Sequence, residues 1–186
     1  HKVIKVDAPD TKGNYIGSAY EYDGQTFGDL LDVLNYIDAS LSLANAVVVA
    51  EKETDTTPTE KQKEAGNYKK GHVQVGTFNI TIENPKGSVR SGIDTEGNKW
   101  ETTMQNTYGY IRGTEGVDGD HIDVFLSDDI DGWNGRRVFV VDQYNEDGSF
   151  DEHKVMLGFN ETDDAEAAYF ANYDSDWANN HKTVVT

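Results

Sequence analysis

Short segments in which apolar and polar residues alternate recur along the chain and constrain its fold more than any other feature. The clearest segment spans residues 72–82, with a turn near Gly76. Similar segments span residues 108–111, 122–126, 138–144 and 150–157, and a turn signal, Asp147-Gly148, separates the last two. Alternation with a period of two is typical of strands with one buried face. Many short strands with few helices predict a small closed or nearly closed barrel.

The first fifty residues have a mixed pattern. Residues 3–6 and 19–27 alternate weakly around Asp23-Gly24, so we expect short strands that form a hairpin. A helix should follow and pack against a sheet, because apolar residues recur at intervals of three and four. These residues are Phe27, Leu30, Leu31, Leu34 and Ile37. Residues 46–50 read as a buried strand. We interpret residues 1–50 as a small N-terminal α/β appendage.

Residues 51–70 are polar and charged and follow neither the helical nor the strand period, which predicts a linker or a surface excursion. Residues 71–186 then form the main domain. Near its end, Thr162 should cap a helix whose first turn holds Asp163 and Asp164, since acidic residues are favourable at the positive end of a helix dipole. The fold class that we predict is therefore α+β and rich in strands.

The charge balance limits the partners of the protein. Its 186 residues include 34 acidic and 16 basic side chains, a formal charge of −18, which would repel nucleic acid and anionic membranes. No apolar run approaches the roughly 20 residues of a membrane span, so we expect a soluble, cytoplasmic protein without membrane or nucleic acid partners. The chain has no Cys and starts without Met or a signal-peptide pattern, and we expect a segment of a longer polypeptide.

A cluster of acidic residues carries the strongest functional signal. Seven carboxylates and no Lys or Arg lie between Glu115 and Asp131. Clustered like charges oppose folding unless a cation lies among them, and Mg²⁺ prefers carboxylate oxygen. The alternative to a metal site is an acidic loop that is simply solvated and has no function. An EF-hand is excluded, because the Gly comes too early and position twelve from Asp118 is Asp129 instead of Glu.

The surroundings of this cluster resemble the family I soluble inorganic pyrophosphatases. Their signature is Tyr-Gly-[Tyr/Phe]-Ile followed at a fixed distance by Asp-[Gly/Ser/Asn]-Asp-[Pro/Glu]-aliphatic-Asp-aliphatic, and residues 108–124 match it without a gap except at His121. A looser likeness extends from about Ile80 to Trp177. The chain is most similar to the pyrophosphatase-like domains of multidomain phage and mobile-element proteins. The resemblance implies a five-stranded barrel of the oligonucleotide-binding type for residues 71–186.

The resemblance also implies a metal site and a proton acceptor. Asp118, Asp120 and Asp123 match magnesium ligands of the family, and Asp120 matches the carboxylate that accepts a proton from the attacking water. Further downstream the family has an Asp and then an Asp-x-Lys. Asp142 fits the first position, and Glu152 and Lys154 fit the second with Glu in place of Asp.

Phosphate-binding residues follow from the same comparison. Tyr108 matches a tyrosine that contacts phosphate, and Glu83 lies where the family has a Glu at the end of an early strand. Arg90 is nearest to a phosphate-binding Lys, and Lys99 is the candidate for the family's Arg. Tyr173 matches the tyrosine of a Tyr-Lys pair, but Asp174 replaces the Lys. Taken without the family, Tyr108 is equally a core aromatic residue, and Asp142 and Glu152 equally the polar face of a hairpin.

The resulting hypothesis is a magnesium-dependent hydrolase of inorganic pyrophosphate, with manganese as an alternative ion and a homo-oligomer compatible with the sequence. Metal ions must neutralise the phosphoanhydride, and basic residues must hold the electrophilic phosphate. Two alternatives stay open. One is a hydrolase of nucleotides or other substituted pyrophosphates, and the other is a non-catalytic binding module of a phage or mobile-element protein that retains the fold.

Overall fold

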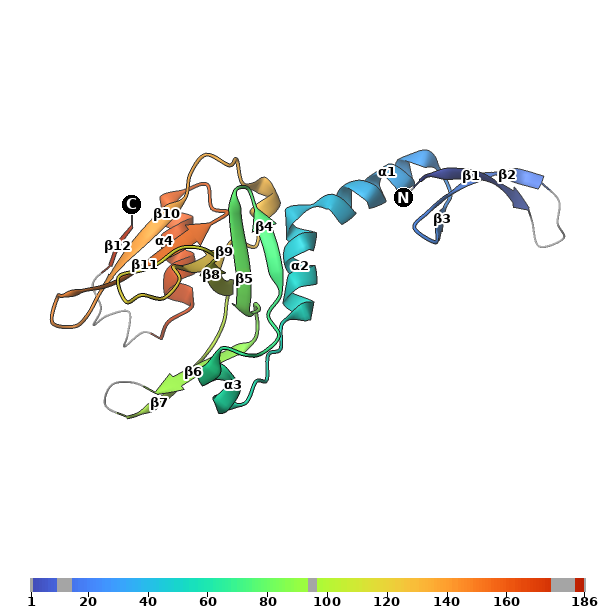
Figure 1. The fold of residues 1–186 in the computed structure, drawn as a ribbon. Coiled ribbons are helices and arrows are strands. Elements are labelled where there is room, and N and C mark those ends of the chain that lie inside the picture. Colours follow the sequence, from blue (N-terminus) through green and yellow to red (C-terminus); the bar gives the residue numbers. More distant parts are fainter. Residues whose placement is uncertain (1, 10–14, 94–96, 175–182, 186) are drawn as a thin grey trace. The chain divides into compact units, whose positions relative to one another are not determined.

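The computed structural model describes residues 2–9, 15–93, 97–174 and 183–185. Contacts between its residues divide the chain into two compact units, His1–Asn45 and Ala46–Thr186 (Figure 1).

The smaller unit begins with a three-stranded antiparallel sheet. Strands β1 (Ile4–Pro9), β2 (Tyr15–Tyr22) and β3 (Gln25–Phe27) lie in the order β1-β2-β3. Asp23 and Gly24 have positive φ angles of 51° and 76° at the turn between β2 and β3. Two successive positive φ angles match the twist of a tight hairpin, so the Asp-Gly signal predicted this turn correctly.

Helix α1 (Leu30–Leu41) follows the sheet, as its periodicity predicts, but the leucines of the expected apolar stripe are exposed. Val33 is fully buried, whereas Leu30, Leu31 and Leu34 are exposed, Leu31 to 64%. The expected packing of the leucine stripe is therefore wrong. The contacts that the structure shows here are aromatic instead, with the ring of Tyr36 centred 5.2 Å from Phe27.

Helix α2 (Leu43–Glu53) replaces the buried strand that we expected at residues 46–50. A short apolar run does not distinguish a strand from a buried helix. Two features favour the helix: Ser42 Oγ accepts a hydrogen bond from the N–H of Asn45 at 3.0 Å, and the buried residues Val47 and Ala50 lie three positions apart. No single helix of the described residues is long and apolar enough to cross a membrane; Leu30–Asp38 and Leu43–Glu53 satisfy this criterion only when they are counted together.

The segment 51–70 contains the end of α2 and a short helix, α3 (Glu60–Ala65). Thr59 and Gln62 form a capping box at the start of α3, and Gly66 ends the helix in a left-handed conformation. Beyond α3, Gly71 donates its N–H to Thr54 Oγ1 at 2.9 Å. This hydrogen bond ties the start of the sheet to the end of α2.

The larger unit is built around a seven-stranded sheet in the order β12-β10-β11-β9-β8-β5-β4 (Figure 1). Its strands are β4 (His72–Val75), β5 (Phe78–Asn84), β8 (Thr107–Ile111), β9 (Asp123–Leu126), β10 (Phe139–Tyr144), β11 (Phe150–Leu157) and β12 (Thr183–Val185). The pairing of β9 with β11 is parallel, and every other neighbouring pair is antiparallel. The alternating segments thus predicted the strands well, and the strand-rich α+β class is confirmed. No pairing among the described residues joins β4 to β12, so the closed five-stranded barrel stays a prediction.

Three smaller elements complete this unit. Strands β6 (Val89–Ile93) and β7 (Lys99–Thr103) form a separate hairpin, and Ile130–Gly132 form a 3-10 turn. Helix α4 (Thr162–Ala171) buries Ala165 and Tyr169 in a core that also contains Phe125 and Met156. The residue that precedes the first turn of α4 is Glu161, and its side chain makes no capping hydrogen bond. The expected cap at Thr162 is therefore wrong.

The glycine of the Tyr108-Gly109-Tyr110 motif is required by the spacing of two strands. Gly109 lies opposite Ile82, and a Cβ atom added to it would fall 1.9 Å from the carbonyl oxygen of Thr81. Gly109→Ala should push β8 away from β5 and cost at least about 2 kcal/mol of the free energy of unfolding. Chemical denaturation measures this loss. Gly28→Ala, where no atom lies within 4 Å of the added Cβ, serves as the control and should change little. An equal effect of both substitutions would contradict this explanation.

Candidate active site

Tyr108 on β8, Asp123 on β9 and Arg90 on β6 bring their polar groups together on one face of the sheet. The hydroxyl of the buried Tyr108 donates a hydrogen bond to Asp123 Oδ2. Arg90 Nη2 donates to the same hydroxyl at 3.2 Å, and the guanidinium lies 4.6 Å from the centre of the Tyr108 ring. The indole of Trp100, 37% exposed, lies 5.4 Å from Arg90. These contacts hold a half-buried cation beside a buried phenol.

Lys154 connects Asp123 to a second carboxylate. The parallel pairing of β9 and β11 sets Lys154 beside Asp123, and Lys154 Nζ lies 2.6 Å from Asp123 Oδ2 and 2.7 Å from Glu152 Oε1. Lys154 is 2% exposed. Burial by itself lowers the pKa of an ammonium group, but the surrounding oxygens of Tyr108, Tyr173, Asp123 and Glu152 hold the pKa of Lys154 well above its ordinary value. In this structure the ammonium neutralises carboxylates instead of facing solvent.

Asp142 does not join this group. The Cα partner of Asp142 is His153, and the partner of Gln143 is Glu152. Because side chains alternate across a strand, Gln143 shares the face of Glu152 and Lys154, and Asp142 lies on the opposite face. There Asp142 Oδ1 lies 2.8 Å from His153 Nδ1. Asp142, expected as a metal ligand, therefore lies on the face opposite Glu152 and Lys154, and the residue of β10 that faces Glu152 is the neutral amide of Gln143.

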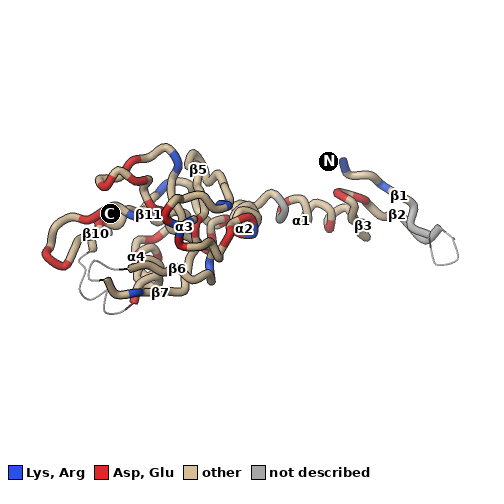
Figure 2. The backbone as a smooth tube through the Cα atoms, turned by 60° about the horizontal axis from the view of Figure 1, so that its bottom comes forward, with Lys and Arg blue, Asp and Glu red and all other residues tan. Residues whose placement is uncertain are grey.

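The acidic loop lies next to these strands. Asp118 and Asp120 are exposed on a turn in which Gly119 has a φ of 88°, and Asp118 Oδ1 accepts a hydrogen bond from the N–H of Asp120 at 3.0 Å. Figure 2 shows that Asp and Glu are spread over many loops and turns of the larger unit. Among the described residues no three carboxylate or imidazole groups lie close enough together to hold one metal ion. In this structure the five expected ligands are separate side chains.

His121, the departure from the family signature, helps to hold this loop. Its ring stacks on Tyr110 with 4.8 Å between centres, and its Nδ1 lies 2.7 Å from the carbonyl oxygen of Thr114. A carbonyl only accepts, so Nδ1 carries the hydrogen in this contact. Thr114 Oγ1 also accepts from the N–H of Ile122 at 3.0 Å. The two contacts close the loop that contains Asp118 and Asp120.

Sequence reasoning missed the partner of Glu83. Lys70 Nζ donates to Glu83 Oε1 at 2.6 Å and lies 4.6 Å and 5.2 Å from the ring centres of Tyr68 and Tyr110. The signal that would have found it is a carboxylate directly after the buried Ile80 and Ile82, because a nearby cation stabilises a partly buried carboxylate.

The two remaining candidates lie on other elements. Lys99 is exposed on β7 opposite Ile93, on the face away from Arg90, and does not join the group. Tyr173 follows α4, and its hydroxyl lies 3.5 Å from Gln143 Oε1. Burial raises the pKa of the Tyr173 phenol, although nearby Lys154 and Arg90 oppose this rise. The structure thus brings together Arg90, Tyr108, Asp123, Glu152, Lys154 and Tyr173.

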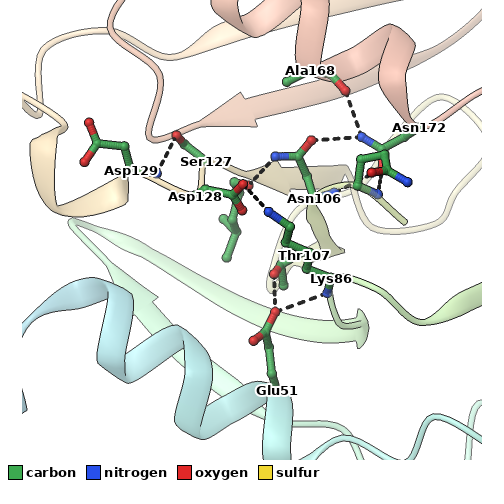
Figure 3. A network of polar contacts seen from close by, with 11 residues as sticks. Glu51, Lys86, Asn106, Thr107, Ser127, Asp128, Asp129, Ala168 and Asn172 are labelled. Atoms are coloured by element: carbon green, nitrogen blue, oxygen red, sulfur yellow. Dashed lines mark hydrogen bonds and ion pairs between the residues drawn. The ribbon is translucent and has the colours of Figure 1, made fainter. Parts of the chain in front are cut away.

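A second polar network joins α2, β8 and α4 (Figure 3). Glu51 accepts hydrogen bonds from Thr107 Oγ1 and from the N–H of Lys86. Asn172 Nδ2 donates to Asn106 Oδ1 at 3.1 Å and to the carbonyl of Ala168 at 2.8 Å. An open pocket of about 410 Å³ borders the network. Among the described residues no buried polar side-chain atom lacks a hydrogen-bond partner, so we interpret this network as structural.

The Lys70–Glu83 ion pair should make stability depend on pH in the alkaline range. Burial lowers the pKa of Lys70, but the hydrogen bond and charge of Glu83 outweigh this and raise it above 10.5. A raised folded-state pKa contributes stability that is fully present below pH 10.5 and is lost as the pH rises through the folded value. Lys70→Met should lower the free energy of unfolding by about 1–3 kcal/mol at pH 8. The difference in the free energy of unfolding between wild type and Lys70→Met should become smaller above pH 10.5.

Denaturant titrations of both proteins at a series of pH values measure this difference. Lys63→Met is the matched control, because the Lys63–Glu60 pair is exposed and such pairs contribute little. A constant gap between wild type and Lys70→Met across the alkaline range would contradict the pairing.

Comparison with known proteins covers the larger part of the chain. Residues 60–186 match the sequence profile of the family described as Inorganic Pyrophosphatase. No curated protein sequence matches the chain. One solved structure, described as an inorganic phosphatase from Anaplasma phagocytophilum, is 18% identical over 57% of this chain and 80% of its own, with a TM-score of 0.34, a likeness too low to support an argument. Because the profile match covers more than half of its residues, the chain belongs to the inorganic pyrophosphatase family.

Proposed function

We propose that the protein hydrolyses inorganic pyrophosphate to orthophosphate in a magnesium-dependent reaction. The observation that carries this proposal is the continuous series of contacts from Arg90 through Tyr108, Asp123 and Lys154 to Glu152. Family membership independently suggests the same reaction. The alternative is that Tyr108 is only a core residue and that Glu152 only lies on the polar face of a hairpin. This alternative explains neither the burial of Lys154 nor the hydrogen bond from Arg90 to Tyr108.

The residues of the acidic loop suit a divalent ion by their chemistry. Asp118, Asp120 and Asp123 offer carboxylate oxygens, and Asp118 and Asp120 make no ion pair among the described residues. Their loop turns at Gly119, where the positive φ angle is one that glycine adopts without strain. Because these carboxylates lie apart in the structure, we propose that they gather around Mg²⁺ or Mn²⁺ only when the ion binds, with Glu152 as a further ligand. A bound ion would neutralise the substrate and lower the pKa of water.

The side chains of this chain supply the remaining chemistry. Arg90 binds one phosphate through guanidinium N–H groups, and Tyr108 holds Asp123 in place. Asp120 accepts a proton from the attacking water as the water oxygen forms a bond to one phosphorus. The bond from that phosphorus to the bridging oxygen then breaks, and the second phosphate leaves with this oxygen. Lys154 keeps Asp123 and Glu152 close together despite their like charges.

A substituted pyrophosphate such as a nucleoside triphosphate is the second candidate substrate. Trp100 presents a partly exposed indole beside Arg90, and aromatic side chains stack on nucleobases. Asp174 also stands where the resemblance implies a phosphate-binding Lys, which leaves more room and less positive charge. If neither substrate reacts, the protein is a non-catalytic binding module.

Magnesium should stabilise the protein through the acidic loop. A ligand that binds the folded state alone raises the melting temperature, and binding at 100 times its dissociation constant adds about 2.7 kcal/mol. Millimolar Mg²⁺ should raise the melting temperature, and a chelator should reverse the rise. Asp118→Asn should weaken this response. Glu146→Gln, which changes an exposed acid in the turn between β10 and β11, is the control and should leave it unchanged. The same rise for all three proteins would exclude a metal site at Asp118.

Asp120→Asn tests the proton acceptor. The amide keeps the shape of the side chain but accepts no proton, so kcat should fall by about 10²–10⁴-fold with a smaller change in KM. Phosphate release from pyrophosphate and from nucleotides, with and without Mg²⁺, measures this. If wild type releases no phosphate from any of them, or if the variant is as active as wild type, the proposed mechanism fails.

A further inference from the structure

We infer that Gln143 is a positioning residue that fixes Glu152 on Lys154 and so orders the active site; this inference rests on the proposed function. Gln143 is buried on β10, opposite Glu152 on β11. Its Nε2 donates to Asp151 Oδ2 at 2.6 Å and to Glu152 Oε1 at 3.3 Å. Its Oε1 accepts from the hydroxyl of Tyr169 at 2.7 Å and, more weakly, from that of Tyr173 at 3.5 Å. Both ends of the amide are thus in use.

The direction of every hydrogen bond in this network follows from the chemistry of its members. Lys154 only donates, and the ionised Asp123 and Glu152 only accept. Glu152 Oε1 receives both Lys154 Nζ at 2.7 Å and Gln143 Nε2. If the Gln143 amide were turned over, its oxygen would face two carboxylates that have no hydrogen to give. The amide therefore has one allowed orientation.

Other side chains of similar size do not meet these demands. Glu would place a third carboxylate beside Asp151 and Glu152 and would offer them no donor, and Met would remove the oxygen that accepts from the Tyr169 hydroxyl. The amide of Gln143 donates to the acids of β11 and at the same time accepts from Tyr169 on α4 and from Tyr173 beyond it. Gln143 thereby links the helix to the Glu152–Lys154–Asp123 contacts.

The hydrogen bond from Gln143 helps to determine where the carboxylate oxygens of Glu152 lie. Glu152 is less than one-third exposed, and the two donors on its Oε1 set its orientation. Without Gln143, Glu152 loses one donor and Lys154 loses a fixed acceptor. Catalysis is sensitive to such displacement, since a shift of about 1 Å in a reacting geometry costs about 100-fold in rate.

Kinetics of Gln143→Met test the positioning role. For pyrophosphate with saturating Mg²⁺, we expect kcat to fall by about 10–100-fold and KM to change less than about threefold. Gln74→Met is the matched control, because Gln74 is exposed on β4 and its side chain bonds, among the described residues, only to the carbonyl of Gly76. An unchanged kcat in a folded Gln143→Met variant overturns the inference. If that variant does not fold, Tyr169→Phe replaces it, and kcat should then fall by about 2–10-fold.

A charge swap tests the contact without an activity measurement. Gln143→Glu should lower the melting temperature by about 3–8 °C, because it sets like charges together and removes a donor. In the double variant Gln143→Glu with Glu152→Gln, the amide at position 152 donates to the carboxylate at position 143, so at least half of the loss should return. A double variant no more stable than Gln143→Glu alone overturns the inference. If wild type hydrolyses no phosphoanhydride, the proposed function fails. The melting temperatures of the single and double variants still show whether Gln143 and Glu152 are in contact.

Discussion

The buried ammonium of Lys154 is the interaction on which the candidate site depends. It lies between Asp123 on β9 and Glu152 on β11 and is almost inaccessible to solvent. Two carboxylates at this position would repel each other, and each would lose hydration without a partner. The lysine therefore makes the arrangement stable, and Tyr108 and Arg90 extend it towards the β6–β7 hairpin. The charge of Lys154 opposes the effect of burial on Glu152, but burial outweighs it and raises the pKa of that carboxyl group.

Periodicity predicted the strands of the larger unit because each has one face against the core. The segment from His72 to Ile82 and the hairpin around Asp147-Gly148 show this directly. Periodicity failed at residues 46–50, because a run of Ala and Val shows no alternation. The helix there is stabilised by the cap at Ser42. Periodicity also missed β6 and β7, whose residues are mostly exposed and show no apolar face.

The sequence predicted the site residues that lie within one motif. It predicted less well the residues whose position depends on the register between two strands. Tyr108 and Asp123 stand in a contiguous signature, and the structure brings them together. Asp142 was chosen because it fits an Asp of the family, but the register of β10 against β11 decides which side chain faces Glu152, and that residue is Gln143. A shift of one residue moves a side chain to the opposite face of a sheet. Lys70, 13 positions before Glu83, carried no local signal of its own.

The parallel pairing of β9 with β11 has a consequence for how the site forms during folding. Asp123 and Lys154 lie 31 residues apart, and Lys154 belongs to the β10–β11 hairpin, whose first strand lies between the two residues in the sequence. Local contacts close with less loss of chain entropy than distant ones, and parallel strands require a crossover connection. The hairpin can therefore assemble before it docks beside β9. The Asp123–Lys154 ion pair then belongs to the late, cooperative part of folding, and a partly folded chain contains the hairpin but not the site.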